Sequence, residues 1–303
     1  MNPEPRAMNR RHFLQRSGAA AAVGAILGPG AARAFAAARS APVPAEIGIQ
    51  LYTLRDVLPG DVNGVLEMLK RYGIDLVETA GYAEREPGDF RAALDAIGLK
   101  TPSAHAMVAE IIPPGTSMSD AGLPRFQDAL EVAQAVGHDY LVIPWLPEDA
   151  RPDRDGYLRL ADLLNEFGEQ AQGTGVTVGY HNHDFEFETF GTDRPAYFDF
   201  VERLDPDRVV LELDLYWVAV AGHDPVDVFA RYPGRFPLWH VKDGAGPDMT
   251  QTDVGAGTLD WPAIFAASET AGLRHAFLEA DTPPDGDSLA FARDSMRYVD
   301  SLR

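Results

Sequence analysis

Short strand-like runs alternate with helical patterns through most of the chain, and this alternation constrains the fold more than any other feature. Eight such runs can be counted, each ending in polar or aromatic residues. Strands separated by helices pair in parallel through right-handed crossovers, and eight of them favour closure into a barrel. The expected strands are Ile47–Leu51, Leu76–Thr79, Thr101–His105, Tyr140–Ile143, Val176–His181, Val209–Asp214, Leu238–Lys242 and Ala276–Glu279.

The segments between these strands carry apolar residues at the i, i+3, i+4 spacing of amphipathic helices. Asp260 before Trp261-Pro262, and Asp224 before Pro225, predict N-caps with proline in the first turn. The sequence therefore predicts an α/β protein, a single (β/α)8 TIM barrel. A doubly wound sheet is the alternative, but no G-x-G-x-x-G follows the first strand. The clearest helices are Val62–Tyr72, Phe126–Val136, Tyr157–Ala171 and Pro262–Ala271.

The first 36 residues differ from the rest and predict an export signal. Arg10-Arg11 precedes Phe13-Leu14 in a twin-arginine pattern, and an Ala/Gly-rich run follows from Gly18 to Leu27. Either Ala32-Arg33-Ala34 or Ala34-Phe35-Ala36 offers a cleavage site. We expect residues 1–36 to be removed after twin-arginine (Tat) export and residues 37–303 to form the barrel. The mature protein would then be periplasmic or secreted. The start codon, Met1 or Met8, stays open.

Composition narrows the classes of partner. The chain has 26 basic and 46 acidic residues, and without residues 1–39, which hold six Arg and one Glu, 20 and 45 remain, a net charge of −25. So acidic a surface repels phosphate backbones and anionic lipid, and no later apolar run approaches the roughly 20 residues of a membrane span. We expect neither nucleic-acid nor membrane partners. The absence of cysteine excludes thiolate ligands, cysteine nucleophiles and disulfides.

Polar side chains stand at the carboxyl ends of the expected strands. These ends converge on one face of a barrel, so residues from distant parts of the chain form one cluster. An unpaired carboxylate is costly to bury there, whereas a divalent cation compensates it. The strand-end residues are Gln50, Tyr52, Glu78, His105, Trp145, His181, His183, Asp214, His240, Lys242 and Glu279.

Several of these residues lie in segments that jointly resemble the sugar phosphate isomerase/epimerase superfamily, the xylose-isomerase-like barrels. The similarity runs from about Glu46 to Arg303. The motifs that carry it are GYHNHDFEF at 179–187, LD at 213–214, HVKD at 240–243, GAGTLDW at 255–261 and LE at 278–279.

This resemblance implies one divalent ion at the mouth of the barrel. Asp214, His240 and Glu279 take ligand positions of the family, and His181 stands where its epimerases have a glutamate. Nitrogen and carboxylate ligands suit Mn²⁺, Mg²⁺ or Co²⁺, with Zn²⁺ not excluded. The alternatives are a helix cap for Asp214, which the following Leu-Tyr-Trp-Val argues against, a surface carboxylate for Glu279 and a core histidine for His240.

The histidine at position 181 bears on the reaction. Two-face epimerisation in the family is attributed to two metal-bound glutamates, of which only Glu279 is present here. A His-x-His pair looks more like the inosose-dehydratase branch and favours elimination or another one-base reaction. His181 and His183 lie two apart on a strand and point the same way, which suits a shared site or a structural pair. Which of them is the ligand stays open.

The remaining roles are assigned by position. We expect catalysis by His183, Glu279, Lys242 and His105, with a local Lys242–Asp243 ion pair as the alternative for the lysine. The loops 83–88, 111–124 and 187–195 are expected to cover the substrate, and the remaining histidines of the barrel, His138, His223 and His275, to lie at the surface. The expected substrate contacts are Gln50, Tyr52, Glu78, Trp145, Glu186 and Trp217.

The function that follows is a metal-dependent reaction next to a carbonyl of a small carbohydrate, through an enediolate. Elimination from a 3-keto-glycoside is favoured by the expected export, by the histidine at position 181 and by the acidic surface. A ketose epimerase or aldose–ketose isomerase is the alternative, and a non-catalytic sugar-binding protein is the alternative of another class. An apurinic-type endonuclease shares the barrel, but Trp217 stands where it would need a histidine. The oligomeric state is not indicated.

Overall fold

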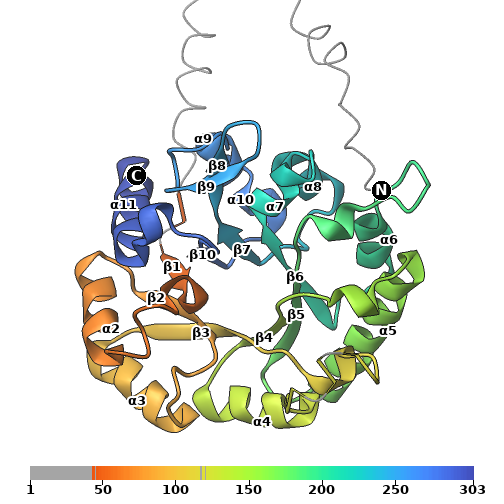
Figure 1. Ribbon diagram of the computed structural model, residues 1–303, viewed down its shortest axis with the longest axis horizontal. Coiled ribbons are helices and arrows are strands. Elements are labelled where there is room, and N and C mark those ends of the chain that lie inside the picture. The colour runs from red at the N-terminus through yellow and green to blue at the C-terminus, as the bar shows by residue number, and fades with distance from the viewer. Residues whose placement is uncertain (1–42, 45, 117, 120) are drawn as a thin grey trace, which may run out of the picture. The chain divides into compact units, whose positions relative to one another are not determined.

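The barrel predicted from the strand pattern is present and closed. A computed structural model describes residues 43–44, 46–116, 118–119 and 121–303. Its eight barrel strands pair in parallel in the order β1-β10-β7-β6-β5-β4-β3-β2 (Figure 1). The strands are β1 Ile47–Gln50, β2 Leu76–Ala80, β3 Lys100–His105, β4 Tyr140–Ile143, β5 Thr177–His181, β6 Val209–Asp214, β7 Leu238–Val241 and β10 His275–Leu278.

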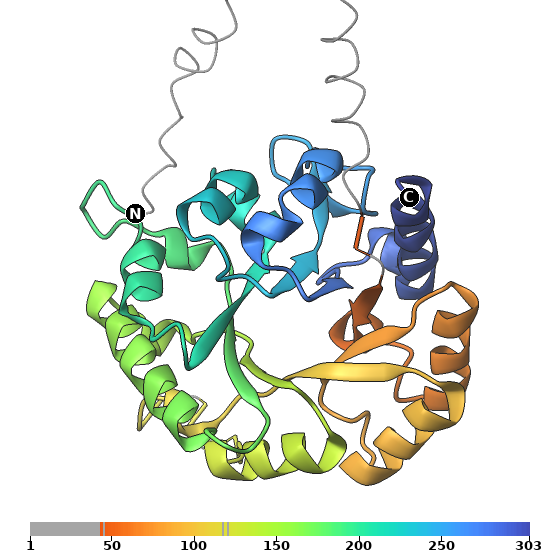
Figure 2. The ribbon, with the colours of Figure 1, turned by 180° about the vertical axis from the view of Figure 1, so that it is seen from behind.

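Helices cover the outside of the barrel, as the view from behind also shows (Figure 2). Both predicted N-caps are confirmed, since Asp260 accepts a hydrogen bond from the amide of Ala263 and Asp224 from that of Val226. The helix expected at 262–271 is two short helices that meet at Ala267. The α-helices are α2 Val62–Arg71, α3 Pro87–Ile97, α4 Phe126–Val136, α5 Arg154–Gln170, α6 Ala196–Arg203, α7 Leu215–Val220, α8 Pro225–Arg231, α9 Trp261–Ala266, α10 Ser268–Ala271 and α11 Ser288–Ser301.

Within the described residues, five short 3-10 helices lie in the loops, at Leu51–Leu54, Ala109–Ile111, Glu148–Ala150, Phe185–Phe187 and Pro284–Gly286. The sequence pattern did not predict a small antiparallel hairpin that follows β7, made of β8 Asp243–Ala245 and β9 Thr250–Thr252. Its strands have only three residues each, too few for the alternation that identifies a strand.

The inward side chains change from apolar to charged along several barrel strands. Leu76, Val142, Leu238 and Phe277 form a buried apolar cluster. Side chains two residues apart on a strand share a face, so the positions that follow Leu76, Leu238 and Phe277 on the same side are Glu78, His240 and Glu279. Polar groups therefore gather beyond the apolar cluster, towards the carboxyl ends of the strands.

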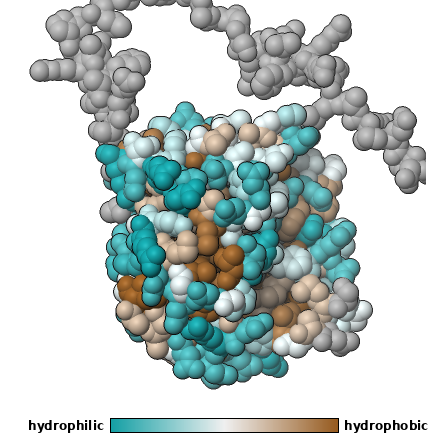
Figure 3. Space-filling model, turned by 60° about the vertical axis from the view of Figure 1, so that its left-hand side comes forward, coloured by the Kyte–Doolittle hydropathy of each residue, from teal (hydrophilic) through white to brown (hydrophobic). Residues whose placement is uncertain are grey.

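The described residues belong to one compact unit, residues 41–303. The predicted export signal, with its boundary at residue 36, lies outside them. Among the described helices, none has the length and apolar character that crossing a membrane requires. In Figure 3, hydrophobic side chains gather in the middle of the face that comes forward, among hydrophilic surroundings.

One expectation about a histidine is wrong. His138 is buried rather than at the surface, because it follows α4 directly and its Nδ1 atom lies 2.8 Å from the carbonyl oxygen of Thr101. The loop position in the sequence concealed this, since the partner is on a different βα unit.

Candidate active site

Four residues from four strands bring potential metal ligands together at the mouth of the barrel. We call His181, Asp214, His240 and Glu279 the four-ligand group. Each offers one nitrogen or carboxylate oxygen, and these atoms all lie within 4.8 Å of one another. All four side chains are buried. The structure thus assembles the set that the sequence predicted; that this set binds a metal stays a prediction.

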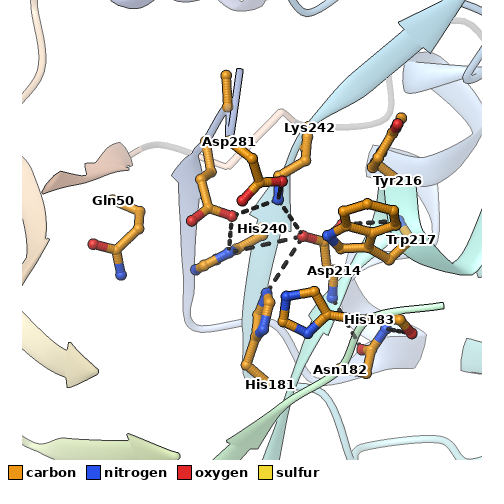
Figure 4. Close-up of polar contacts among 12 residues, drawn as sticks. Gln50, His181, Asn182, His183, Asp214, Tyr216, Trp217, His240, Lys242 and Asp281 are labelled. Carbon is orange, nitrogen blue, oxygen red and sulfur yellow. Dashed lines mark hydrogen bonds and ion pairs between the residues drawn. The ribbon is translucent and has the colours of Figure 1, made fainter. Parts of the chain in front are cut away.

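One ring nitrogen of His181 is held by the backbone. Its Nδ1 atom lies 2.9 Å from the carbonyl oxygen of Pro144. A carbonyl oxygen only accepts hydrogen bonds, so Nδ1 is the donor and Nε2 is the nitrogen left for the site. That Nε2 atom lies 3.3 Å from Oδ2 of Asp214, inside the group (Figure 4). His181, and not His183, is therefore the member of the pair that faces the other three potential ligands.

Asp214 has two structural roles, one for each carboxylate oxygen. Oδ1 accepts a hydrogen bond of 3.0 Å from the amide of Trp217 and caps α7. The prediction from the residues Leu-Tyr-Trp-Val that Asp214 does not cap a helix is wrong. A cap depends on the backbone turn, and apolar residues can follow it. Oδ2 points to His181 and Lys242 and stays available to the site.

The ammonium group of Lys242 lies among the acidic groups of the site. Its Nζ atom is 2.9 Å from Asp214, 2.7 Å from Glu279 and 2.8 Å from Asp281. Figure 4 shows the lysine with Asp214 and Asp281 beside it. Burial opposes the charged lysine, but the three carboxylates outweigh it and hold the pKa of Lys242 well above its usual value. The lysine is a buried cation here rather than a proton acceptor.

The expected local ion pair between Lys242 and its neighbour in sequence does not form. The two side chains point opposite ways from consecutive positions. Asp243 is buried and accepts hydrogen bonds from the amides of Gly255 and Thr258 and from the indole of Trp261. Asp243 thus orders the loop after β7, and Lys242 contacts the carboxylates of the site instead.

Beneath the four-ligand group lies a second buried cluster, which we call the lower cluster: Glu78, His105, Glu212 and His240. His240 joins the two clusters, with Nδ1 2.7 Å from Glu279 and Nε2 2.7 Å from Glu78. His105 Nε2 lies 2.6 Å from Glu212. A carboxylate that holds the far nitrogen of a ligating histidine fixes the orientation of the ring, so Glu78 is placed to position His240.

The two carboxyl groups of the lower cluster have opposite pKa shifts. Burial raises the pKa of Glu78, but His105 and His240 outweigh it and lower the value to about 2. Burial, and then the charge of Glu78, raise the pKa of Glu212 well above its usual range. Glu78 is therefore the more acidic of the two carboxyl groups, and Glu212 takes up a proton more readily.

His183 lies beside the four-ligand group with a free ring nitrogen. Its Nδ1 atom is buried and has no hydrogen-bond partner among the described residues. Burial, together with His181 and Lys242, holds the pKa of His183 well below its usual value, so the ring is neutral. Glu186 fixes the backbone at this point by accepting a 2.8 Å hydrogen bond from the amide of His183.

A cavity of about 730 Å³ opens over these groups. Residues of the first two expected covering loops line it, including Pro87, Leu123 and Pro124, whereas the loop 187–195 does not. The predicted site residues that line the cavity are Tyr52, His105, Trp145, His181, His183 and Glu279.

Four of the six predicted substrate contacts lie outside the cavity lining. Gln50 is buried and donates a 2.7 Å hydrogen bond to Glu78, whose other oxygen accepts one from Ser103. Glu186 is buried behind the site and held by Tyr180. Trp217 packs beside Lys242 and His183. Strand-end position alone did not distinguish side chains that reach the cavity from those satisfied by internal partners.

Two buried or partly buried acids of the site were not among the predicted residues. Glu212 lies two residues before Asp214, and Asp281 lies two residues after Glu279 and lines the cavity. Strand alternation was the signal that could have found both, because inward positions recur every second residue. Asp281 also accepts a hydrogen bond from Gln251 of the hairpin, which the sequence did not predict.

The donor set of the four-ligand group suits a divalent cation. Two imidazoles and two carboxylates offer neutral nitrogen and anionic oxygen, a mixture compatible with Mn²⁺, Co²⁺ or Zn²⁺. The outer contacts of His181 and His240 orient both rings, as they do around bound metals. The residues therefore fit a metal ion, and their chemistry does not choose among the ions.

A closed parallel barrel with imidazole and carboxylate groups at the carboxyl ends of its strands has the architecture of the TIM-barrel enzymes. Residues 66–302 match the family described as Xylose isomerase-like TIM barrel, and the chain belongs to this family.

Among curated proteins, the chain is similar to the inosose dehydratase of Lacticaseibacillus casei. The two are 26% identical over 167 residues, which cover 48% of this chain and 55% of the relative. The chain therefore matches about half the length of that relative.

Solved structures share the fold. A sugar phosphate isomerase/epimerase from Parabacteroides distasonis has a TM-score of 0.69 and 26% identity, and the match covers 84% of this chain and 96% of the other. A structure of the IOLI protein with a bound zinc atom has a TM-score of 0.66 and 16% identity, covering 85% of this chain and 96% of the other, a likeness of fold alone.

Proposed function

We propose that this chain is a divalent-metal-dependent enzyme that acts next to a carbonyl of a sugar derivative, by elimination from a 3-keto-glycoside or a related keto-sugar. The observation that carries the proposal is the four-ligand group: four potential ligands within 4.8 Å of one another, at the mouth of a barrel and beside a large cavity. The names of relatives, an inosose dehydratase and a sugar phosphate isomerase/epimerase, support the substrate class.

His183 is the base in this proposal. A neutral imidazole that lines the cavity can accept a proton from carbon. Burial opposes ionisation of Glu279, but His240 and Lys242 hold the pKa of this carboxyl well below its usual range. The carboxylate of Glu279 is therefore held by two cationic partners and suits ligation better than proton transfer.

A divalent ion on the four-ligand group would supply Lewis-acid stabilisation of negative charge on the carbonyl oxygen. His183 removes the proton from the carbon next to the carbonyl, and the electron pair forms a double bond to the neighbouring carbon. The bond from that carbon to the leaving oxygen breaks, and the proton on His183 passes to this oxygen. The products are an unsaturated ketone and an alcohol, and no further reactant is needed.

Lys242 has a supporting part. Its ammonium compensates the charges of Asp214, Glu279 and Asp281 and keeps Asp281 aimed at the cavity, where this carboxylate can accept a hydrogen bond from a substrate hydroxyl.

An epimerase or isomerase of the same keto-sugar would use the same first proton transfer. Epimerisation needs a second base on the opposite face of the substrate. Glu279 is paired with His240 and Lys242, which makes its carboxylate less suited to act as this second base.

The first experiment measures bound metal in wild type and in Asp214→Asn by ICP-MS. Asparagine keeps a side-chain oxygen for the α7 cap and removes the charge, so a loss of metal is not a loss of the helix. We expect near-stoichiometric divalent metal in wild type and little in the variant. Absence of metal in wild type after reconstitution with each ion would contradict the proposal and favour a sugar-binding protein.

The second experiment follows the products from a 3-keto-glycoside. We expect release of the aglycone by wild type and a decrease of roughly 10²- to 10⁴-fold in kcat for His183→Gln, with bound metal unchanged. His223→Gln is the matched control, because His223 packs against Phe187 and Phe198 away from the cavity lining. A product of unchanged mass would assign the chain to the epimerase or isomerase reaction instead.

A further inference from the structure

The cavity extends beyond the polar site into the space between the barrel and its helices. Ser103 and His105 contact Glu78 and Glu212 inside the barrel, so Ala104 between them faces outwards, and Ala104 lines the cavity. Helix α4 lies outside β3 and β4 (Figure 1) and contributes lining residues too. We call this part of the cavity the apolar lobe and define it by Tyr82, Ala104, Met107, Leu123, Ala129 and Val132.

Small side chains line the lobe in the region where a barrel strand and its helix usually pack closely. Ala104 on β3 and Ala129 on α4 are both cavity-lining alanines, and the larger Met107 and Leu123 stand in loops at its rim. Protein interiors are normally packed closely and leave few voids larger than a water molecule. The open space is therefore a property of this sequence and not of the barrel in general.

Size and chemistry together indicate what the lobe accommodates. The whole cavity, with its polar end and the lobe together, has a volume of about 730 Å³, within the roughly 300 to 1,000 Å³ of pockets that take drug-sized ligands. The lining residues include the acids Asp128, Glu279 and Asp281 but no lysine or arginine, so no cationic side chain lines the cavity to pair with a phosphate. An uncharged apolar group, bound beside the sugar, fits both the size of the cavity and the lack of lysine and arginine in its lining.

We propose that the apolar lobe binds the uncharged, bulky apolar aglycone of the substrate, so that the substrate class is apolar glycosides rather than free sugars or sugar phosphates. This inference rests on the proposed function. The thioether of Met107 and the ring of Tyr82 suit contact with an aromatic ring of such an aglycone. The sugar occupies the polar end, near His181 and His183.

The experiment compares two substrates, an aryl and a methyl 3-keto-glucoside, on three metal-loaded proteins. Val132→Phe fills the lobe from α4, and Ala135→Phe, at an exposed position of the same helix outside the lining, is the matched control. We expect kcat/KM for the aryl substrate to fall about tenfold or more in Val132→Phe, with the methyl substrate unaffected. Ala135→Phe is expected to leave both unchanged.

Binding of 2-naphthol, measured by calorimetry without substrate, separates the lobe from the reaction. Binding to wild type that Val132→Phe weakens and Ala135→Phe does not supports the lobe, even if neither glycoside is turned over and the proposed function fails. Turnover of both glycosides with equal kcat/KM, and no naphthol binding, would overturn the lobe while the proposed function stands. Equal losses for both substrates in Val132→Phe would also overturn it, because a general disturbance of the barrel then explains the result.

Discussion

The Nζ atom of Lys242 lies 2.7 Å from Oε2 of Glu279, a carboxylate of the four-ligand group. The same ammonium reaches Asp214 at 2.9 Å, so one buried lysine compensates both carboxylates of that group. These carboxylates are the natural ligands of a divalent cation. The lysine and a bound ion would therefore act on the same charges, and the stability of the protein should report their interaction.

We predict that Lys242→Met lowers the free energy of unfolding of the metal-free protein by about 3–5 kcal/mol, because it leaves buried carboxylates without a partner. Divalent cation should restore part of the loss. Urea unfolding of wild type and variant, with chelator and with excess Mn²⁺ or Zn²⁺, measures both effects. Lys100→Met, which removes an exposed pair with Glu46, is the control and should leave the unfolding midpoint unchanged. A metal-free Lys242→Met as stable as wild type would contradict the prediction.

Glu78 should influence metal affinity without touching the metal. Its Oε2 atom holds Nε2 of His240 at 2.7 Å, whereas Nδ1 of the same ring faces the four-ligand group. We predict that Glu78→Gln weakens metal binding roughly 10- to 100-fold, as loss of such outer partners does. Metal titration by calorimetry measures the change. Ser103→Ala, which removes only a hydrogen bond to the other carboxylate oxygen, should have a smaller effect, and equal affinities for wild type and Glu78→Gln would refute the positioning role.

The burial of Glu186 predicts a dependence of stability on pH. Burial, opposed by hydrogen bonds from Tyr180 and the His183 amide, raises the pKa of Glu186 from 4.5 to about 7. The folded state then binds more protons than the unfolded state between these values. The stabilising contribution is therefore complete below pH 4.5 and is lost as the pH rises through about 7, a change of about 3 kcal/mol at roughly 1.4 kcal/mol per pH unit.

Glu186→Gln removes this titration. Unfolding by urea at several pH values from 5 to 8 should give a wild-type free energy that falls relative to that of the variant as the pH rises. Glu188→Gln, at an exposed position of the same loop, should follow wild type. Parallel curves for wild type and Glu186→Gln would show that Glu186 is ionised throughout.

We propose that the chain is exported by the twin-arginine route, on residues outside the described part of the structure. Replacing Arg10 and Arg11 by lysine in the full-length chain should move the protein from the periplasmic to the cytoplasmic fraction. The exported wild type should begin near Ala37, which N-terminal sequencing of the periplasmic fraction measures. Equal periplasmic amounts of both proteins would exclude the route.

Most of the fold could be predicted from the sequence because strand and helix periods are local properties. The expected strand Val209–Asp214 and helix Phe126–Val136 agree with the structure at both ends. The four-ligand group was also predictable, since strand ends converge in a barrel whatever the loops do. Its members lie on four strands, and the resemblance to a known family pointed to three of them.

Which polar residues reach the cavity was decided only by the tertiary structure. Gln50 and Glu78 stand at strand ends like His105, yet they satisfy each other inside the barrel and do not line the cavity. Glu78 and His240 are 162 residues apart in sequence and 2.7 Å apart in space. No local pattern encodes such a contact.

The sequence by itself determined the barrel, the alternation that turns side chains inwards and the residue types available to a metal. The tertiary structure decided that Lys242 pairs with carboxylates across the barrel rather than with the adjacent Asp243, and that Ala104 and Ala129 leave an apolar lobe open. The physical reason is that local periodicity sets the direction of a side chain, whereas its partner is set by packing between segments distant in sequence.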